Sequence, residues 1–279
     1  MNLQYFSEAR GLRKGYGLSE LRDMVLDLYN DLRERGHLTE WLGYVCIDAG
    51  FVAGTGGQQP GRELLVEIGR RDVWPVANAV SSWTEDGIFD LLQFLGTKVS
   101  SPVPDTGFYH DFASCGWHEQ EFTRAPARTE FLSRVNKILS RYNDGWEMKA
   151  DFEIVECAPV GMASLLKAEL PNSTDSQMRA RIRAAIDKYR RRSSSASDRR
   201  DAVRDLGDVL EVMRAEAKLH LSKDEVDLFN ILNNFNIRHA NAKQKTDYDA
   251  IWLSALFYHC LALIHVLTRI VEREATRKR

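Results

Sequence analysis

Cysteine and proline are scarce in this chain, which has 4 cysteines and 7 prolines among its 279 residues. The cysteines (Cys46, Cys115, Cys157 and Cys260) are far apart, which excludes the dense disulfide framework of a small secreted domain. The first residues also lack the basic stretch followed by an apolar run that is typical of a signal peptide. We therefore expect a protein of the reducing cytoplasm.

A strong overall charge is also missing, because the formal net charge is only −2. This balance hides an asymmetry: residues 1–175 contain 17 Lys/Arg against 26 Asp/Glu, whereas residues 176–279 contain 21 against 14. An acidic first part and a basic second part indicate two functional units, the second facing an anion. The alternative is that the basic runs at 190–192 and 277–279 are simply solvated chain segments.

Only one stretch, residues 251–270, is long and strongly apolar, and it contains His259, His265 and Arg269. A membrane span usually has about 20 residues with few or no ionisable groups. We therefore predict no membrane association. The pattern favours a helix that is buried on most faces, within a bundle or at a subunit contact.

The first part, residues 1–160, mixes helical and extended patterns. Amphipathic spacing predicts helices at 20–35, 85–99 and 131–142. Short apolar or alternating stretches predict strands at 64–68 and 146–155. The glycine-rich stretch 54–61 lacks the Gly-Lys-Ser/Thr ending of a phosphate-binding loop, so we interpret it as a hairpin turn. These patterns predict an α+β N-terminal domain with a small sheet.

The second part reads as helical throughout, after a linker at 161–175 that contains Pro171-Asn172-Ser173-Thr174. Four helices with short joints are expected within residues 176–279. Their signals are the amphipathic stretch 176–192, a cap at Ser197, a capping box at Ser222–Glu225 and a start at Asp247 or Asp249. This pattern predicts an all-α helical bundle as the C-terminal domain.

Zinc-ligand residue types gather at His110, Cys115 and His118. A structural zinc site needs four ligands, usually in paired short spacings. The fourth would have to come from Cys46, Cys157 or elsewhere. The spacing instead favours three side chains that pack and hydrogen-bond locally, so neither a metal nor a cofactor is expected.

An arginine and a histidine, Arg238 and His239, stand side by side shortly before the final apolar stretch. Arginine recognises phosphate through its charge and fork geometry, and histidine transfers protons near neutral pH. Asn241, Lys243 and Lys245 follow closely and are suited to binding phosphate. The alternative is structural: Arg238 pairs with an acidic residue of the bundle and His239 caps a helix end.

The position of Arg238-His239 before a long final helix resembles HEPN domains, helical bundles of bacterial toxins and phage-defence ribonucleases. Their motif is Arg, a polar residue, a short gap and His. The second histidine would fall near residues 243–245, which are Lys-Gln-Lys here. The stretches Asp72-Val73-Trp74-Pro75 and Cys115-Gly116-Trp117-His118 make the first part similar to an N-terminal domain of AbiJ-type abortive-infection proteins.

These resemblances imply a metal-independent ribonuclease that acts in bacterial antiphage defence. In such enzymes a base helps the ribose 2′-hydroxyl attack the adjacent phosphate, and arginine stabilises the developing charge. Arg238 and His239 would be the catalytic residues. Two copies would meet in a homodimer through the apolar final helix.

The missing motif histidine leaves two other interpretations open. The chain would then be a catalytically degenerate HEPN-like module that binds RNA, nucleotide or a protein partner as the sensor or scaffold of a defence system. Alternatively, it is a structural two-domain protein in which the Arg-His pair only holds a helix joint.

Overall fold

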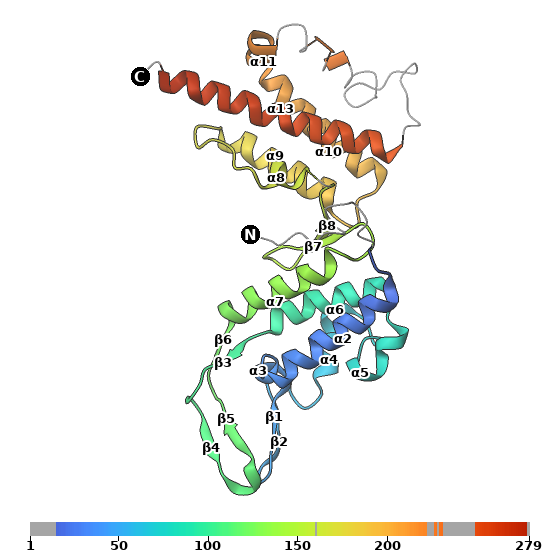
Figure 1. Cartoon of the computed structure of the whole chain (residues 1–279), viewed down its shortest axis with the longest axis vertical. Helices are drawn as coiled ribbons and strands as arrows, with labels where there is room; N and C mark the ends of the chain where they lie inside the picture. Colours follow the sequence, from blue (N-terminus) through green and yellow to red (C-terminus); the bar gives the residue numbers. More distant parts are fainter. Residues whose placement is uncertain (1–14, 160, 222–225, 228, 231–248, 278–279) are drawn as a thin grey trace, which may run out of the picture. The chain divides into compact units, whose positions relative to one another are not determined.

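The computed structural model describes residues 15–159, 161–221, 226–227, 229–230 and 249–277. The chain forms two compact units, Met1–Val155 and Glu156–Arg279, and each has its own apolar core. Figure 1 shows helices with short strand pairs in the first unit and mainly helices in the second. Helices combined with small two-stranded sheets are compatible with the expected α+β class.

The helices of the first unit enclose one core. They are α2 (Leu18–Glu34), α3 (Thr39–Leu42), α4 (Pro60–Ile68), α5 (Val76–Ala79), α6 (Glu85–Lys98) and α7 (Arg124–Leu139). The predicted helices at 20–35 and 85–99 are confirmed as α2 and α6. The helix predicted at 131–142 begins earlier, as α7. Its first two turns are mostly exposed and therefore lack the apolar spacing on which the prediction relied.

The strand predicted at 64–68 is wrong, because these residues belong to α4. Pro60 occupies the first helical turn, where its missing N–H costs no hydrogen bond, and Gly69 ends the helix in the left-handed conformation. Within α4 only Leu64 is buried. A short apolar run is ambiguous between strand and helix, and here the flanking proline and glycine decide.

Among the residues that the structure describes, eight short strands form four two-stranded sheets. The pairs are β1 (Tyr44–Cys46) with β2 (Gly50–Val52), β3 (Ser101–Pro102) with β6 (Phe122–Thr123), β4 (Phe108–His110) with β5 (Gly116–His118), and β7 (Trp146–Met148) with β8 (Ile154–Glu156). The predicted strand at 146–155 is therefore two strands. The predicted hairpin turn at 54–61 is wrong, because residues 55–58 form a turn that joins β2 to α4, which begins at Pro60.

The second unit contains α8 (Ala163–Lys167), α9 (Ser176–Arg190), α10 (Ala196–Val212), α11 (Arg214–Leu221) and α13 (Ala250–Arg277). Helix α10 packs against both α9 and α13. The rings of Tyr189 and Phe257 stack at 3.9 Å between their centroids in this core. The cap of α10 is Ser195, which forms a capping box with Asp198, and not the predicted Ser197.

Helix α13 is long and apolar enough to cross a membrane by length and composition alone, and half of its most apolar window is buried in the unit. Burial against neighbouring helices is what a bundle helix requires. It begins after Asp249, one of the two predicted starts, and the Asp249 carboxylate accepts a hydrogen bond from the N–H of Ile251. The predicted capping box at Ser222–Glu225 lies outside the described residues.

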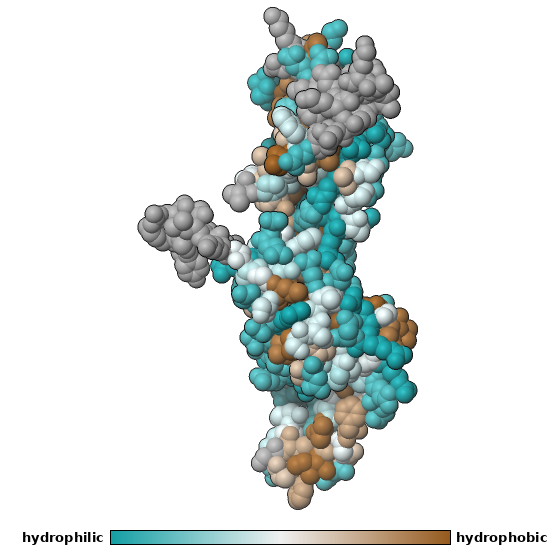
Figure 2. All heavy atoms as spheres, turned by 90° about the vertical axis from the view of Figure 1, so that its right-hand side faces the viewer, coloured by the Kyte–Doolittle hydropathy of each residue, from teal (hydrophilic) through white to brown (hydrophobic). Residues whose placement is uncertain are grey.

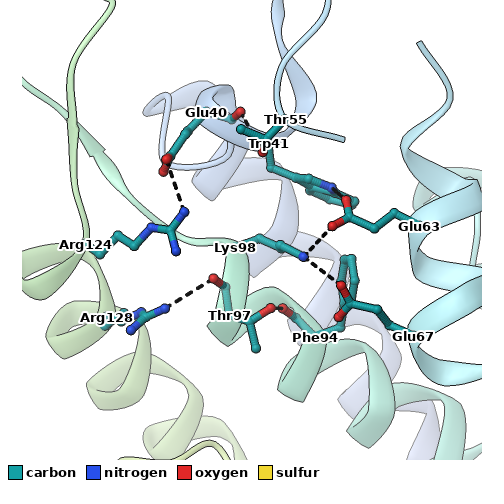
Figure 3. Close-up of polar contacts among 10 residues, drawn as sticks. All are labelled: Glu40, Trp41, Thr55, Glu63, Glu67, Phe94, Thr97, Lys98, Arg124 and Arg128. Carbon is teal, nitrogen blue, oxygen red and sulfur yellow. Dashed lines mark hydrogen bonds and ion pairs between the residues drawn. The ribbon is translucent and has the colours of Figure 1, made fainter. Parts of the chain in front are cut away.

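A half-buried lysine joins α4 to α6 in the first unit. Lys98 Nζ lies 2.6 Å from Glu63 Oε1 and 3.0 Å from Glu67 Oε1, as Figure 3 shows. The indole N–H of Trp41 donates to the other oxygen of Glu63 at 2.6 Å. Burial disfavours the Glu63 carboxylate, but the hydrogen bonds from Lys98 and Trp41 outweigh it and lower its pKa.

Substituting Glu63 by Gln removes the negative charge that accepts hydrogen bonds from both Lys98 and Trp41. We expect E63Q to lower the free energy of unfolding by about 1–2 kcal/mol at pH 7. The pKa of Glu63 is lowered in the folded state, so its contribution is present above the ordinary value of 4.5 and is lost as the pH falls below it. When denaturant unfolding is measured from pH 7 to pH 3, the unfolding free energies of wild type and E63Q should become equal at the low end.

The matched control is E67Q. Glu67 also contacts Lys98, but its side chain is 43% exposed, against 31% for Glu63. Solvent screens an exposed pair more strongly, so E67Q should cost less. Equal decreases in unfolding free energy for E63Q and E67Q at every pH would contradict the proposed role of Glu63.

Candidate metal centre

Four metal-ligand side chains converge between two hairpins of the first unit. They are Cys46 of β1, His110 of β4, Cys115 directly before β5 and His118 of β5, and their ligand atoms all lie within 4.8 Å of one another. Cys46 Sγ lies 3.6 Å from His110 Nδ1, and Cys115 Sγ lies 3.1 Å from His118 Nε2. Such a group offers one complete set of ligands to a single ion.

Strand alternation points these side chains toward each other. Side chains two residues apart share a face of a strand, so Cys46 lies on the same face of β1 as Tyr44. The Tyr44 ring stacks on the His118 ring, with 4.5 Å between the centroids. The β1–β2 and β4–β5 hairpins are therefore packed face to face, and Figure 1 shows them side by side.

Two glycines permit the close approach at the second hairpin. A Cβ on Gly107 would lie 1.7 Å from the carbonyl oxygen of His118, which no other residue can accommodate. Gly116 directly follows Cys115 and has a φ of +90°, a conformation that side chains rarely adopt. Glycine at both positions allows the tightly turned backbone that brings the side chains of Cys115 and His118 close together.

The surroundings of Cys46 favour the thiolate, which is the form of cysteine that binds metals. A hydrogen bond from the backbone of Ala49 outweighs burial and, with further bonds from Asp48 and His110, lowers the pKa of the Cys46 thiol. His110 Nε2 lies 2.9 Å from the Asp48 carboxylate, on the opposite side of the ring from Cys46. A carboxylate behind a histidine orients the ring and strengthens it as a ligand.

The geometry and the chemistry of the four atoms fit Zn²⁺. A tetrahedral zinc ion with bonds of about 2.0–2.3 Å separates its ligand atoms by roughly 3.3–3.8 Å. The two separations of 3.1 and 3.6 Å lie close to this range. Two sulfurs and two imidazoles are a typical structural zinc set, whereas Mg²⁺ and Ca²⁺ prefer oxygen.

The sequence alone left the fourth ligand open among Cys46, Cys157 and other residues, and it favoured local packing without a metal. The structure brings Cys46 to the other three residues, although it is 64 residues away from His110 in the chain. Cys157 belongs to the second unit. The sequence pattern was incomplete because residues 110–118 contain only three ligands. The fourth comes from the other hairpin, which the packing of the two hairpins brings close.

The roots of both hairpins are tied together at a single glutamate of α3. The backbone carbonyl of Glu40 accepts hydrogen bonds from Thr55, which follows β2. Its carboxylate pairs at 3.1 Å with Arg124, which follows β6 (Figure 3). Both hairpins are thus anchored at their bases on the helical core, and the four ligands lie beyond these anchors.

An open groove of about 700 Å³ borders the first hairpin. Its wall is mostly apolar and includes Tyr44, Val45, Phe51 and Trp74. Tyr44 also stacks on the ligand His118, so the groove and the metal centre share a side chain. The position of this wall therefore depends on the same contacts as the centre.

The predicted phosphate-directed residues lie elsewhere in the chain. The catalytic candidates Arg238 and His239 and the phosphate-binding candidates Asn241, Lys243 and Lys245 all lie outside the described residues. Their roles remain predictions from the sequence. In comparisons with known proteins, the chain matches no family model, no curated protein and no solved structure.

Proposed function

We propose that the first unit is a zinc-stabilised recognition module, in which one Zn²⁺ bound by Cys46, His110, Cys115 and His118 fixes two hairpins on a helical core. The observation that carries this proposal is the convergence of the four ligand atoms within 4.8 Å. Each hairpin has strands of three residues. A lone two-stranded hairpin of this size is marginally stable, and a metal supplies the missing stability.

The role of the ion is structural. Catalytic zinc sites have three protein ligands and keep the fourth position for water or substrate, whereas four protein ligands close the coordination sphere. The ligand Cys46 is only 4% exposed and His118 only 5%, so little of the centre is open to a substrate. The function of the zinc is to set the shape and rigidity of the surface around it.

The full chain should purify with about one equivalent of zinc, measured by elemental analysis. Cys115→Ser removes one ligand and should reduce the zinc content several-fold. Removal of the metal should lower the stability of the first unit by several kcal/mol, because binding and folding of the site are coupled.

Cys157→Ser is the matched control, since Cys157 lies in the second unit and should leave the zinc content unchanged. A wild-type chain without zinc, whose thermal unfolding also fails to respond to added Zn²⁺, would exclude the metal centre.

A second candidate function concerns the second unit, which we propose is a HEPN-type, metal-independent ribonuclease of an antiphage abortive-infection system. It is supported by Arg238-His239 in the chain shortly before α13 and by the basic balance of residues 176–279. Arg238 would stabilise the charge on phosphate and His239 would transfer the proton. Because the second motif histidine is missing, a degenerate module that binds RNA, nucleotide or a partner protein is the alternative.

If the second unit cleaves RNA, Arg238→Ala and His239→Ala should each lower the rate by about 100-fold or more. RNA cleavage by the purified chain and growth arrest on expression are the measurements. Lys218→Ala, which changes an exposed lysine of α11, is the matched control. Equal cleavage by all four proteins would remove the assignment, and RNA binding without cleavage would favour the degenerate module.

A homodimer through α13 belongs to the same proposal. Four exposed residues recur every three, four or seven positions along this helix, which places them on one face: Trp252, Ala255, His259 and Val266. Trp252 is 53% and Val266 48% exposed. A mainly apolar stripe that remains exposed after the bundle has formed is suited to a second copy of the helix.

Val266→Asp places a charge on this stripe and should convert a dimer into a monomer at micromolar concentration, measured by light scattering. Val271→Asp is the control, because Val271 is exposed on the same helix but lies about 140° away from Val266 around its axis. A wild-type monomer, or equal dissociation by both variants, would contradict the proposed dimer.

A further inference from the structure

The metal-bearing hairpins expose an unusual share of the apolar surface. Seven large hydrophobic side chains of these two hairpins are more than 36% exposed: Val45, Ile47, Phe51, Phe108, Tyr109, Phe112 and Trp117. Figure 2 shows the hydrophobic colour gathered at this end of the first unit. Exposed apolar side chains in such number mark interaction sites in soluble proteins.

Alternation along β4 and β5 separates two faces. His110 and His118 point to the metal centre, so Tyr109 and Trp117 point to the opposite face. Tyr109 and Trp117 are cross-strand partners, with their rings edge to face at 5.6 Å, and are 55% and 49% exposed. Phe112, between the two strands, is 65% exposed. Its ring stacks near that of the ligand His110, with 6.4 Å between the centroids. We therefore call only Tyr109 and Trp117 the aromatic face.

Stabilisation of the hairpin alone does not explain why Tyr109 and Trp117 are exposed. A cross-strand aromatic pair stabilises a hairpin, which accounts for the contact between Tyr109 and Trp117. That contact leaves about half of each ring in solvent. Two aromatic side chains that stay about half exposed on one face of a short hairpin therefore require a second reason.

The charged residues in the segment that carries the aromatic face are all acidic. Residues 99–123 contain no lysine or arginine but four acidic residues: Asp105, Asp111, Glu119 and Glu121. Asp111 directly follows β4 and Glu119 directly follows β5. A negative surface repels the phosphates of nucleic acids and attracts cations. Aromatic rings together with carboxylates are the groups that bind a guanidinium, which stacks on the rings and pairs with the acids.

We propose that the aromatic face of the β4–β5 hairpin binds an arginine-rich segment of a protein partner. The inference rests on the proposed metal centre, because Trp117 stands between the ligands Cys115 and His118. With both neighbours fixed by the ion, Trp117 and its partner Tyr109 are held in position before binding. Preorganised side chains lose less conformational entropy when the partner binds.

The test uses the full chain loaded with zinc and a fluorescent peptide of Arg-Ser repeats, followed by anisotropy at low and physiological salt. We expect Trp117→Ala and Tyr109→Ala to weaken peptide binding by about tenfold or more, as for central aromatic contacts. Asp111→Asn should weaken it less and flatten the salt dependence. A Lys-Ser peptide of equal length should bind more weakly, because lysine lacks the planar fork.

Phe51→Ala is the matched control. Phe51 is an exposed aromatic on the outward face of β2, where it pairs with Val45, and it belongs to the other hairpin. It should leave peptide binding unchanged. Zinc content is measured for every variant, so that loss of the centre is distinguished from loss of the contact.

Each other outcome overturns the inference. Binding of the peptide that survives both aromatic substitutions would place it elsewhere, and single-stranded RNA binding that depends on Trp117 would identify a nucleic acid as the occupant. Self-association that depends on Trp117 would identify a second copy. Full zinc content without peptide binding refutes the aromatic face alone, whereas absence of zinc refutes the metal centre on which it rests.

Discussion

The arrangement of the first unit depends on the approach of four ligand atoms between two hairpins. Neither hairpin contributes to the main apolar core through its tip, and three-residue strands cannot hold their own positions. Two constraints replace a larger sheet. Glu40 joins the roots through Thr55 and Arg124, and the cysteines and histidines join the outer parts. With roots and tips both fixed, the hairpins become rigid extensions of the helical core.

The sequence predicted those parts whose stability is local and periodic. Helices α2, α6 and α9 each bury a regular apolar stripe, and the stripe is visible in the residue order. The apolar run in α4 was misassigned because one buried residue, Leu64, gives no period. The sequence offered Cys46 as one possible fourth ligand but could not select it, for a different reason. The contact of Cys46 with His110 is produced by the pairing of two hairpins, which no spacing along the chain records.

The asymmetry of charge acquires a structural meaning when the two units are considered separately. The first unit combines acidic hairpins with exposed aromatic residues, a surface suited to a cationic polypeptide. The second combines basic helices with an apolar α13, a composition suited to an anion and to a second copy. Under the two proposals, recognition of a protein and action on a polyanion would belong to separate units. A division of this kind fits a sensor joined to an effector.

The alternation of β4 and β5 makes metal binding and surface display inseparable. His110 and His118 point inward because they lie one position away from Tyr109 and Trp117, which point outward. A slip of one residue in the pairing would exchange the two sets and destroy both. Zinc bound at the proposed centre would favour this register, because it brings all four ligand atoms together. In the proposed centre the ion would therefore do more than add stability to the hairpin: it would determine which side chains are exposed on the aromatic face.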